Sequence, residues 1–398
     1  MDFALNEEQR LLQDTMRRFA TEKVAPRVAE YDREERMPLD LLEELGEMGM
    51  MGGVVPECYG GADMDFVSYA VMIEELSRVC HMLACLVSFP SGLVGSGILH
   101  YGTEEQKERY LKPLAQGRIH GSSGVTEPHS GSDVAAMETT VRRDGDDYII
   151  NGAKIWISNL DIASFFLTFA TLDRSLKSKG ICAFIIDRNT PGLSVRPFKN
   201  KLGFRPICTG ELVLDNVRVH RSQLVGEEGG GFQVAMCAVE NGRLSVASRA
   251  VGIAQACLDA SVGYAKERII FGKPEGQFQL VQSKITDMVI GVETARYLTR
   301  RLGWLKDQGA GDFRNEASMA KMYAGDVAMK CATDAVQILG AYGVSDEYPV
   351  SRYFRDAKVF QIVEGSNDLH RAMIAEYALG YRQRRAVPGA PNISNLTR

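Results

Sequence analysis

The period of the apolar residues changes twice along the chain, and this limits the possible folds more than any other feature. Residues 1–120 and 231–381 place apolar side chains every three or four positions, as helices with one buried face do. Residues 121–230 contain short alternating runs separated by Asp-Gly, Asn-Gly and Pro, which is typical of strands joined by tight turns. This order predicts an α+β protein with an N-terminal helical domain, a middle antiparallel β-barrel or sandwich and a C-terminal helical bundle. Residues 382–398 form a tail to which we assign no function.

Composition and charge exclude several classes of protein. At 398 residues the chain is too long for one compact core. The net charge of −5, with acids and bases interspersed, argues against nucleic acid as the main partner, because phosphate binding needs a concentrated basic surface. No apolar run approaches the ~20 residues that span a bilayer, and the N-terminus lacks a signal-peptide pattern, so we expect a cytoplasmic protein that does not bind membranes. Eight scattered cysteines without a CxxC pair and six histidines without an HExxH pattern predict reduced thiols and no metal site.

One carboxylate, that of Glu364, stands between an apolar run and a predicted helix in "KVFQIVEGSNDLHRAMIAEYAL". Ser366 is placed to cap that helix. An acid so close to a helix N-terminus has two interpretations. It is an electrostatic cap worth up to about 1 kcal/mol, or it is a proton acceptor held in a dry pocket. These residues alone do not decide between them.

Two polar segments are further candidates for binding. "GVTEPHSGSDVAA" (124–136) gathers glycine, hydroxyl groups and backbone donors in one loop, as a site for a polar ring system or a phosphate requires, although a capped turn has the same composition. "NGAKIWISN" (151–159) is either a hairpin with an ordinary core tryptophan or an aromatic wall for a flat cofactor. "GEEGGGF" (226–232) lacks the GK[ST] of a P-loop, so it indicates a flexible turn.

Together, four separated stretches resemble the acyl-CoA dehydrogenase family, and the match runs from about residue 3 to residue 381. "GVTEPHSGSDVAA" agrees with the family's first signature at every restricted position. "QILGAYGVSDEYPVSRYFRD" (337–356) resembles the second, except that Ala341 stands where Gly or Ser is usual. "RIIFGKPEGQFQ" (268–279) contains the family's Arg-x-x-Phe-Gly followed by Gln, and "VEGSND" resembles its Tyr-Glu-Gly-Thr segment. The resemblance implies the family's fold, in which a β-barrel domain lies between an N-terminal helical domain and a C-terminal four-helix bundle.

The resemblance implies the α,β-dehydrogenation of an acyl-CoA thioester to the trans-2-enoyl-CoA. Glu364 falls where many members carry the catalytic base, while Gly242, before Arg243, leaves no acid on the long helix that some relatives use instead. Removal of the α-proton needs a base and a polarised carbonyl, and the β-hydride needs a flavin, because no side chain accepts hydride. We expect the Glu364 backbone N–H to hold the thioester oxygen, and burial against Ile362 and Val363 to raise the pKa of Glu364.

For the cofactor FAD, the resemblance implies contacts from both the loop and the strand. Thr126 should contact the pyrimidine side of the ring system, Trp156 should pack on the ring, and Ser158 should lie near N5. Ser366 and Asp368 fall at positions that touch the adenosine phosphate. Relatives often have Thr and Gln at these two positions, so Asp368 departs from the family pattern.

Further cofactor contacts should come from a neighbouring subunit, so the resemblance implies a homo-oligomer, commonly a tetramer, with electron-transfer flavoprotein as the electron acceptor. The residues that would reach the neighbour's FAD are Arg268, Phe271, Gln279, Gln337, Gly340 and Ala341.

On the substrate side, Ser132 resembles a residue shared between FAD and pantetheine, Arg243 resembles a CoA-contacting arginine, and Gly365 adjoins the base. Alternatively, Arg243 is a solvated helix residue. Ala84 stands roughly where glutaryl-specific relatives carry an arginine, so we expect no free distal carboxylate on the acyl group.

The acyl group itself is not defined by these motifs. Val363 replaces an aromatic residue, and "LVSFPSGLVG" (86–95) is expected to line the pocket, which is compatible with a branched or cyclic acyl chain. Two alternatives remain open: the same chemistry on an acyl group carried by a carrier protein in a biosynthetic pathway, or a flavin-binding member without catalysis. The intact Glu364 opposes the second alternative.

Overall fold

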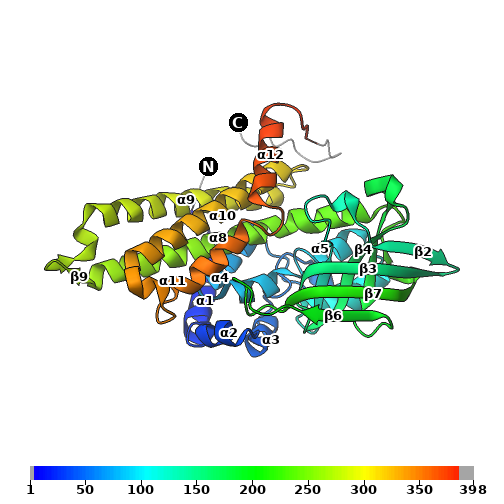
Figure 1. Ribbon diagram of the computed structural model, residues 1–398, viewed down its shortest axis with the longest axis horizontal. Coiled ribbons are helices and arrows are strands. Elements are labelled where there is room, and N and C mark those ends of the chain that lie inside the picture. Colours follow the sequence, from blue (N-terminus) through cyan, green and yellow to red (C-terminus); the bar gives the residue numbers. More distant parts are fainter. Residues whose placement is uncertain (1–3, 385–398) are drawn as a thin grey trace.

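The computed structural model describes residues 4–384, so most of the tail expected at 382–398 lies outside the described residues. Helices form one end of an elongated molecule and a β-sheet forms the other (Figure 1). The expected order of helical, β and helical parts is therefore confirmed.

The N-terminal part is helical. Its helices are α1 (Glu7–Phe19), α2 (Val28–Glu34), α3 (Leu39–Glu47), α4 (Phe66–Ser88), α5 (Gly95–Tyr101), α6 (Glu104–Gln106) and α7 (Lys112–Ala115). Most of α4 is buried, and it is kinked at Cys80, whose φ of −142° is not helical. Helix α4 packs against both α1 and the long helix of the C-terminal part, so it ties the two helical parts together.

The middle part is one eight-stranded sheet. Its strands are β1 (His120–Gly124), β2 (Thr140–Asp144), β3 (Asp147–Ser158), β4 (Ala163–Thr171), β5 (Ile181–Asp187), β6 (Leu193–Pro197), β7 (Thr209–His220) and β8 (Leu224–Val225). The strand order is β6-β7-β3-β2-β4-β5-β8, and β1 pairs with β4. Most pairs are antiparallel, but β1–β4 and β2–β4 are parallel because the chain leaves the sheet between these strands.

The C-terminal part consists of α8 (Gly231–Glu267), α9 (Gln279–Asp307), α10 (Arg314–Leu339), α11 (Val350–Phe360) and α12 (Asn367–Ala378). The short strands β9 (Ile269–Ile270) and β10 (Lys273–Pro274) form a hairpin between α8 and α9. Helix α8 contacts α4, α9 and α10 and is the centre of this part. It approaches α4 so closely that a Cβ on Gly252 would lie 2.5 Å from the Glu74 carbonyl oxygen.

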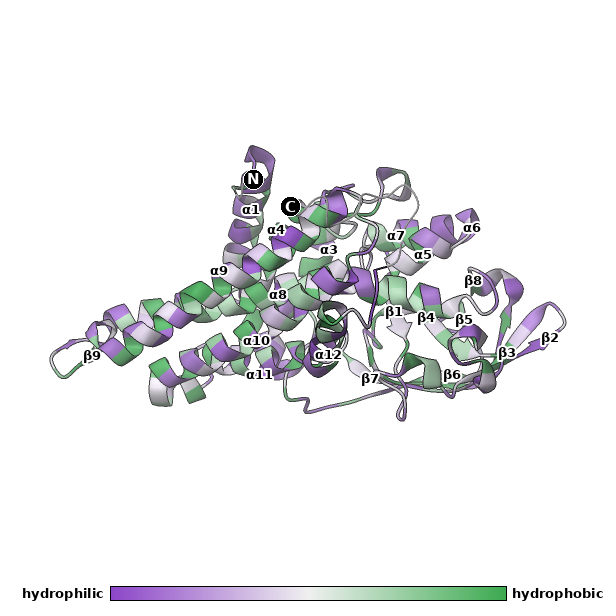
Figure 2. Ribbon diagram, turned by 90° about the horizontal axis from the view of Figure 1, so that it is seen from above, coloured by the Kyte–Doolittle hydropathy of each residue, from purple (hydrophilic) through white to green (hydrophobic). Residues whose placement is uncertain are grey.

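Helix α12 lies between the bundle and the sheet in both views (Figures 1 and 2). Residues 4–384 contain no helix that is long and apolar enough to cross a membrane. All eight cysteines are free thiols. Within the same residues, no group of His, Cys, Asp and Glu is arranged to hold a metal ion.

Candidate active site

Glu364 lies in the short turn that joins α11 to α12. Its φ of 57° places a residue with a side chain in the left-handed region, and Gly365 follows with a φ of 93°. A residue other than glycine in this region costs of order 1–3 kcal/mol, so the surrounding contacts must hold it there. Helix α12 then begins, with the Ser366 hydroxyl as its N-cap accepting from the Leu369 N–H at 3.2 Å. The predicted cap is thus confirmed.

Three basic side chains hold the two carbonyl groups of this turn. Arg243 Nε donates to the Glu364 carbonyl oxygen at 3.4 Å, and His370 Nε2 lies 3.2 Å from the same oxygen. Lys321 Nζ donates to the Gly365 carbonyl oxygen at 2.6 Å. Arg243 is 6% exposed, so the alternative of a solvated helix arginine is wrong. These bonds fix the backbone conformation that Glu364 needs.

The Glu364 carboxylate faces helix α8 at Gly242. A Cβ built on Gly242 would lie 2.8 Å from Glu364 Oε1, so a side chain there would displace the carboxylate from this position. Glu364 Oε2 is buried and accepts no hydrogen bond from the described residues. A buried carboxylate without such bonds is a strong proton acceptor.

Burial raises the pKa of Glu364 to about 7, although the cations of Arg243, Arg249 and Lys321 act in the opposite direction. The expected direction of the shift is confirmed, but the expected cause is partly wrong. Ile362 is 58% exposed and does not enclose the carboxylate. The enclosure comes from Gly242 on α8, a residue far away in the sequence.

The loop 124–136 is anchored to β3 by a buried ion pair. Lys154 Nζ lies 2.6 Å from Glu127 Oε1, and both side chains are almost fully buried. The Glu127 carboxylate also accepts the Thr139 N–H at 2.9 Å. Burial lowers the pKa of Lys154 to about 8. The Thr126 carbonyl accepts the Ile155 N–H at 2.9 Å, which places Thr126 beside the strand that carries Trp156 and Ser158.

Trp156 and Ser158 lie near the C-terminal end of β3. Trp156 is 61% exposed, and one edge of its ring contacts Phe198, with ring centroids 5.2 Å apart. The segment that begins at Phe198 continues to Phe204. The ring centroids of Phe204 and Phe360 are 5.3 Å apart, and Phe360 on α11 stands four residues before Glu364. The alternative of an ordinary core tryptophan is therefore wrong, because most of this indole is open to solvent.

Six residues expected to contact FAD lie far from Glu364 in this chain. Helix α8 carries the chain 25 residues from Arg243 to Arg268, about 37 Å along its axis. Phe271 is 94% exposed at the tip of the β9–β10 hairpin, at the end of the molecule opposite the sheet (Figure 1). The turn that contains Gly340 lies near this end, because Tyr342 and Tyr264 are 6.4 Å apart. The structure therefore places Thr126, Trp156 and Ser158 near the sheet, and Arg268, Phe271, Gln279, Gln337, Gly340 and Ala341 toward the other end.

Of three further residues predicted to contact FAD, two are exposed and one already makes a hydrogen bond within the chain. Ser132 is exposed in the loop after β1. The Ser366 hydroxyl is used as the cap of α12. The Asp368 side chain is 97% exposed, and Arg371, its partner in an ion pair, lies 3.7 Å away.

The sequence motifs did not identify several residues that build the site. Lys321 also donates to Asn367 Oδ1 at 2.9 Å, and burial lowers its pKa to about 7. Burial lowers the pKa of His370 to about 3, which keeps the imidazole neutral. A lone basic residue on an apolar helix face is the one signal that marks Lys321, and nothing local shows what it binds.

Family models match the chain in three consecutive segments. They describe the acyl-CoA dehydrogenase N-terminal domain over residues 6–118, the middle domain over 122–217 and the C-terminal domain over 229–379. The resemblance inferred from the motifs is confirmed.

Individual proteins agree with the family models. The chain is 41% identical over 375 residues to the short-chain specific acyl-CoA dehydrogenase of Clostridium acetobutylicum, an alignment that covers 94% of this chain and 99% of that protein. It is 38% identical to a solved glutaryl-coenzyme A dehydrogenase in complex with glutaryl-CoA, with a TM-score of 0.94 over 98% of this chain and 100% of the other. A chain in a solved structure from work on the electron transferring flavoprotein of Acidaminococcus fermentans is 41% identical, with a TM-score of 0.92 over 95% of this chain and 100% of that one.

Proposed function

The chain belongs to the acyl-CoA dehydrogenase family, and we propose that Glu364 is the base of its reaction, the FAD-dependent α,β-dehydrogenation of an acyl-CoA thioester to the trans-2-enoyl-CoA. The observation that carries this assignment is the Glu364 carboxylate, whose Oε2 atom is buried without a hydrogen-bond donor among residues 4–384 and whose pKa is raised to about 7. A base of this pKa is half deprotonated near neutrality and is therefore able to take a proton from a weak carbon acid.

The backbone around Glu364 suits the thioester. The Glu364 N–H donates no hydrogen bond within residues 4–384, so it is available to the thioester oxygen. A donor at that oxygen stabilises the charge that develops when the α-proton leaves. Arg243 and Lys321 hold the carbonyls of Glu364 and Gly365 and thereby fix the direction of this N–H. Arg243 and Gly365 thus form the substrate side of the proposed site.

The residues near the sheet fit a flavin. Trp156 offers an exposed aromatic surface next to a loop whose backbone is fixed by the Glu127–Lys154 pair. Thr126 and Ser158 flank this surface with backbone and hydroxyl groups, and Ser132 is exposed for a contact shared with pantetheine. FAD, when bound, accepts the hydride that leaves the β carbon.

The residues at the far end fit a second copy of the chain. One chain does not bring Arg268 and Phe271 to its own Trp156, and Phe271 is almost fully exposed. Helix α9 also carries an exposed apolar face (Figure 2), which includes Val289, Ile290 and Tyr297. Apolar faces of this kind are typical of subunit contacts. We assign a homotetramer in which these residues, with Gln279, Gln337, Gly340 and Ala341, reach a neighbour's FAD.

The adenosine end of FAD is assigned to the start of α12. The helix N-terminus and the Ser366 backbone favour an anion there. Asp368 disfavours one, because its carboxylate repels phosphate, and Arg371 at 3.7 Å only partly offsets its charge. Asp368 is the weakest of the proposed contacts.

For electron transfer we propose an electron-transfer flavoprotein as the acceptor and the cytoplasm as the compartment. The similarity to a chain from work on such a flavoprotein supports the acceptor. An acyl group on a carrier protein is the second candidate for the substrate, since the reaction at Cα and Cβ needs nothing beyond the thioester itself.

The test of this proposal uses the purified holoenzyme and its Glu364→Gln variant. Acyl thioesters added without oxygen should bleach the flavin of the wild type, and the variant should bind both FAD and thioester while its flavin stays oxidised. A variant that bleaches at the wild-type rate would exclude Glu364 as the base.

A further inference from the structure

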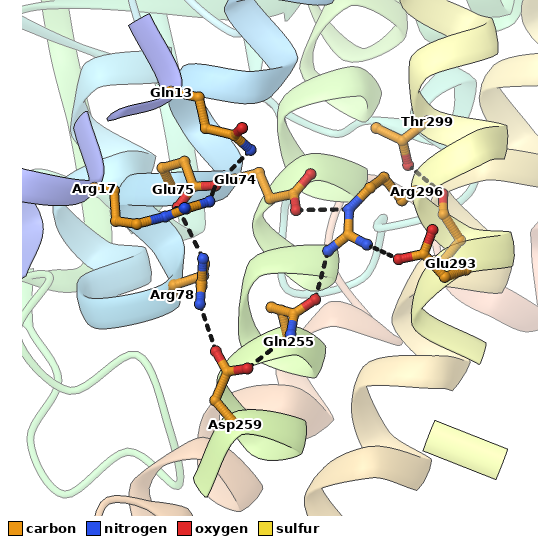
Figure 3. Close-up of polar contacts among 11 residues, drawn as sticks. Gln13, Arg17, Glu74, Glu75, Arg78, Gln255, Asp259, Glu293, Arg296 and Thr299 are labelled. Carbon is orange, nitrogen blue, oxygen red and sulfur yellow. Dashed lines mark hydrogen bonds and ion pairs between the residues drawn. The ribbon is translucent and has the colours of Figure 1, made fainter. Parts of the chain in front are cut away.

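Buried charges among residues 4–384, as a rule, either form ion pairs or, as with Arg243, Lys306 and Lys321, donate to neutral oxygens. Figure 3 shows an example where α1, α4, α8 and α9 meet: Glu75 accepts from Arg17 at 2.8 Å and from Arg78 at 3.1 Å. In the same cluster, Arg296 Nε donates to Glu74 at 2.9 Å. Such pairing is what burial of a charge requires, because an unpaired ion loses its hydration without compensation.

Arg249 on α8 departs from this rule. It is 4% exposed, and its Nε and Nη1 atoms are buried without a hydrogen-bond partner in the described part of the chain. Arg249 forms no ion pair within residues 4–384. Its polar neighbour is the thiol of Cys85, and its guanidinium lies 5.8 Å from the centroid of the Phe360 ring. The Glu364 carboxylate interacts with this cation through space, but no carboxylate of residues 4–384 pairs with it directly, so the guanidinium can still bind an anion from outside the protein.

The position of Arg249 relates it to the proposed base. Gly242, Ser245 and Arg249 follow each other at spacings of three and four on α8, so they share one face of the helix. The first of them faces the Glu364 carboxylate, and the Ser245 hydroxyl donates to the Gly242 carbonyl at 2.9 Å. The Cα of Arg249 therefore lies two helical turns, about 10 Å along the axis, from that of Gly242, and its guanidinium is near enough to the Glu364 carboxylate to act on its pKa.

Helix α4 packs against α8 and brings polar side chains close to this face. The buried Tyr69 hydroxyl lies beside those of Ser88 and Ser245, and the Cys85 thiol lies beside Arg249. Closer to Glu364, the chain after α4 has Gly92, whose Cβ would lie 3.5 Å from the Gly242 Cα. The part of α8 around Arg249 is thus surrounded by hydroxyl groups, a thiol and a cation. These groups suit a charged group at the distal end of the acyl chain better than an alkyl group.

We propose that Arg249 binds a carboxylate at the distal end of the acyl group, so that the substrate is the thioester of a dicarboxylic acid. This proposal rests on the function proposed above and names its substrate class. It replaces the expectation, drawn from Ala84, that the acyl group has no distal carboxylate: Ala84 is buried on α4, and the required cation comes from α8 instead. The bonds that react stay the same, and Arg249 only determines where the acyl chain of the substrate is bound.

The experiment compares matched thioesters with and without the distal carboxylate. Anaerobic flavin bleaching is measured for glutaryl-CoA and adipyl-CoA against pentanoyl-CoA and hexanoyl-CoA, in the wild type and in Arg249→Gln. The wild type should prefer the carboxylated thioesters. The rates are compared on the pH plateau, because loss of the Arg249 cation also raises the pKa of Glu364. There, in Arg249→Gln, kcat/KM for the carboxylated thioesters should fall by about 30-fold or more, as expected when one partner of a buried charge pair is removed, while kcat/KM for hexanoyl-CoA stays the same or rises.

A control variant separates substrate binding from general damage. Arg78→Gln removes a partly buried guanidinium on α4 that is paired with Glu75 and Asp259. It should lower thermal stability without changing the ratio between adipyl-CoA and hexanoyl-CoA. If Arg249→Gln does not fold, Arg249→Lys takes its place, with a reduced but not abolished preference for adipyl-CoA.

The outcomes distinguish this inference from the proposed function. An unchanged selectivity ratio in the Arg249 variants would overturn the inference and leave the dehydrogenation intact. An equal loss for all thioesters on the pH plateau would also overturn it, because Arg249 would then act on the catalytic step for every substrate instead of binding a distal carboxylate. A wild-type flavin that no thioester bleaches would contradict the proposed function itself. Binding of adipyl-CoA to the Glu364→Gln holoenzyme, lost when Arg249→Gln is added, supports the inference without turnover.

Discussion

The carboxylate of Glu364 occupies the space that a side chain at Gly242 would fill. A Cβ on Gly242 would lie 2.8 Å from Oε1, 3.0 Å from Cδ and 3.1 Å from Oε2 of Glu364. The two residues are 122 positions apart and belong to α8 and to the α11–α12 turn. The lack of a side chain at Gly242 on α8 therefore leaves the space that the carboxylate of the proposed base occupies.

Replacing Gly242 by alanine should displace the carboxylate. The new methyl group would force Glu364 away from the α carbon of the substrate, and misplacement of a base by about 1 Å costs roughly 100-fold in rate. The measurement is the rate of flavin bleaching by acyl-CoA. Gly263→Ala on the same helix is the matched control, because a Cβ there would meet nothing within 4 Å. It should leave the rate unchanged and stabilise α8 by up to about 1 kcal/mol. Equal rates for both variants would contradict the geometry.

The rate of flavin bleaching should depend on the protonation of Glu364. Burial raises its pKa to about 7, so the carboxylate form, which alone takes a proton, increases as the pH rises through this value. We expect the rate to rise from pH 5.5 and to reach a plateau above about pH 8. Stopped-flow reduction of the flavin across this range tests the prediction. A plateau already reached at pH 5.5 would mean that the carboxylate is not buried in solution.

Lys321 should affect the conformation of the α11–α12 turn through its hydrogen bonds and the pH dependence of flavin bleaching through its charge. Lys321→Met keeps the apolar stem but removes the donor to the Gly365 carbonyl at 2.6 Å and one of the cations near Glu364. The turn should loosen, and the pH midpoint of bleaching should move upward because less positive charge stabilises the carboxylate. Lys330 is an exposed lysine on the same helix that is paired with Asp334. The control Lys330→Met should change neither the conformation of the turn nor the pH midpoint of bleaching.

The Glu127–Lys154 pair should be needed for stability and for flavin retention. Removing one partner of a buried ion pair leaves an uncompensated charge and costs about 3–5 kcal/mol. Lys154→Met should therefore lower the free energy of unfolding by this amount and release FAD from the purified protein. Arg218→Met, which breaks an exposed pair with Asp147 at 2.9 Å, should cost less than about 1 kcal/mol. Chemical unfolding and the ratio of flavin absorbance to protein absorbance are the two measurements.

Local patterns were enough to predict the order of the three parts and the cap at Ser366, because periodicity and capping are properties of neighbouring residues. The two parallel strand pairs were not predictable in this way, since they depend on where the chain returns to the sheet. The expected burial of Glu364 by Ile362 was wrong for the same reason. Its enclosure by Gly242 joins distant segments, and no pattern within the α11–α12 turn contains that information.

The roles of the basic residues on α8 also depend on packing between distant segments, which local sequence patterns do not show. The motif predicts a contact of Arg243 with CoA, and this contact stays a prediction; the structure shows Arg243 donating to the Glu364 carbonyl. Arg249, six residues later, belongs to no motif. Its meaning depends on being buried without a partner, which is a property of the packed structure alone.

The most direct test of the account is an anaerobic titration of the purified flavoprotein with acyl thioesters, with the wild type and Glu364→Gln measured side by side. We expect the wild-type flavin band to bleach. We expect Glu364→Gln to bind the same thioester with its flavin still oxidised, and with thermal stability equal to or above that of the wild type, since a buried ionisable group has been removed. Bleaching of the variant at the wild-type rate would contradict the assignment of Glu364 as the base.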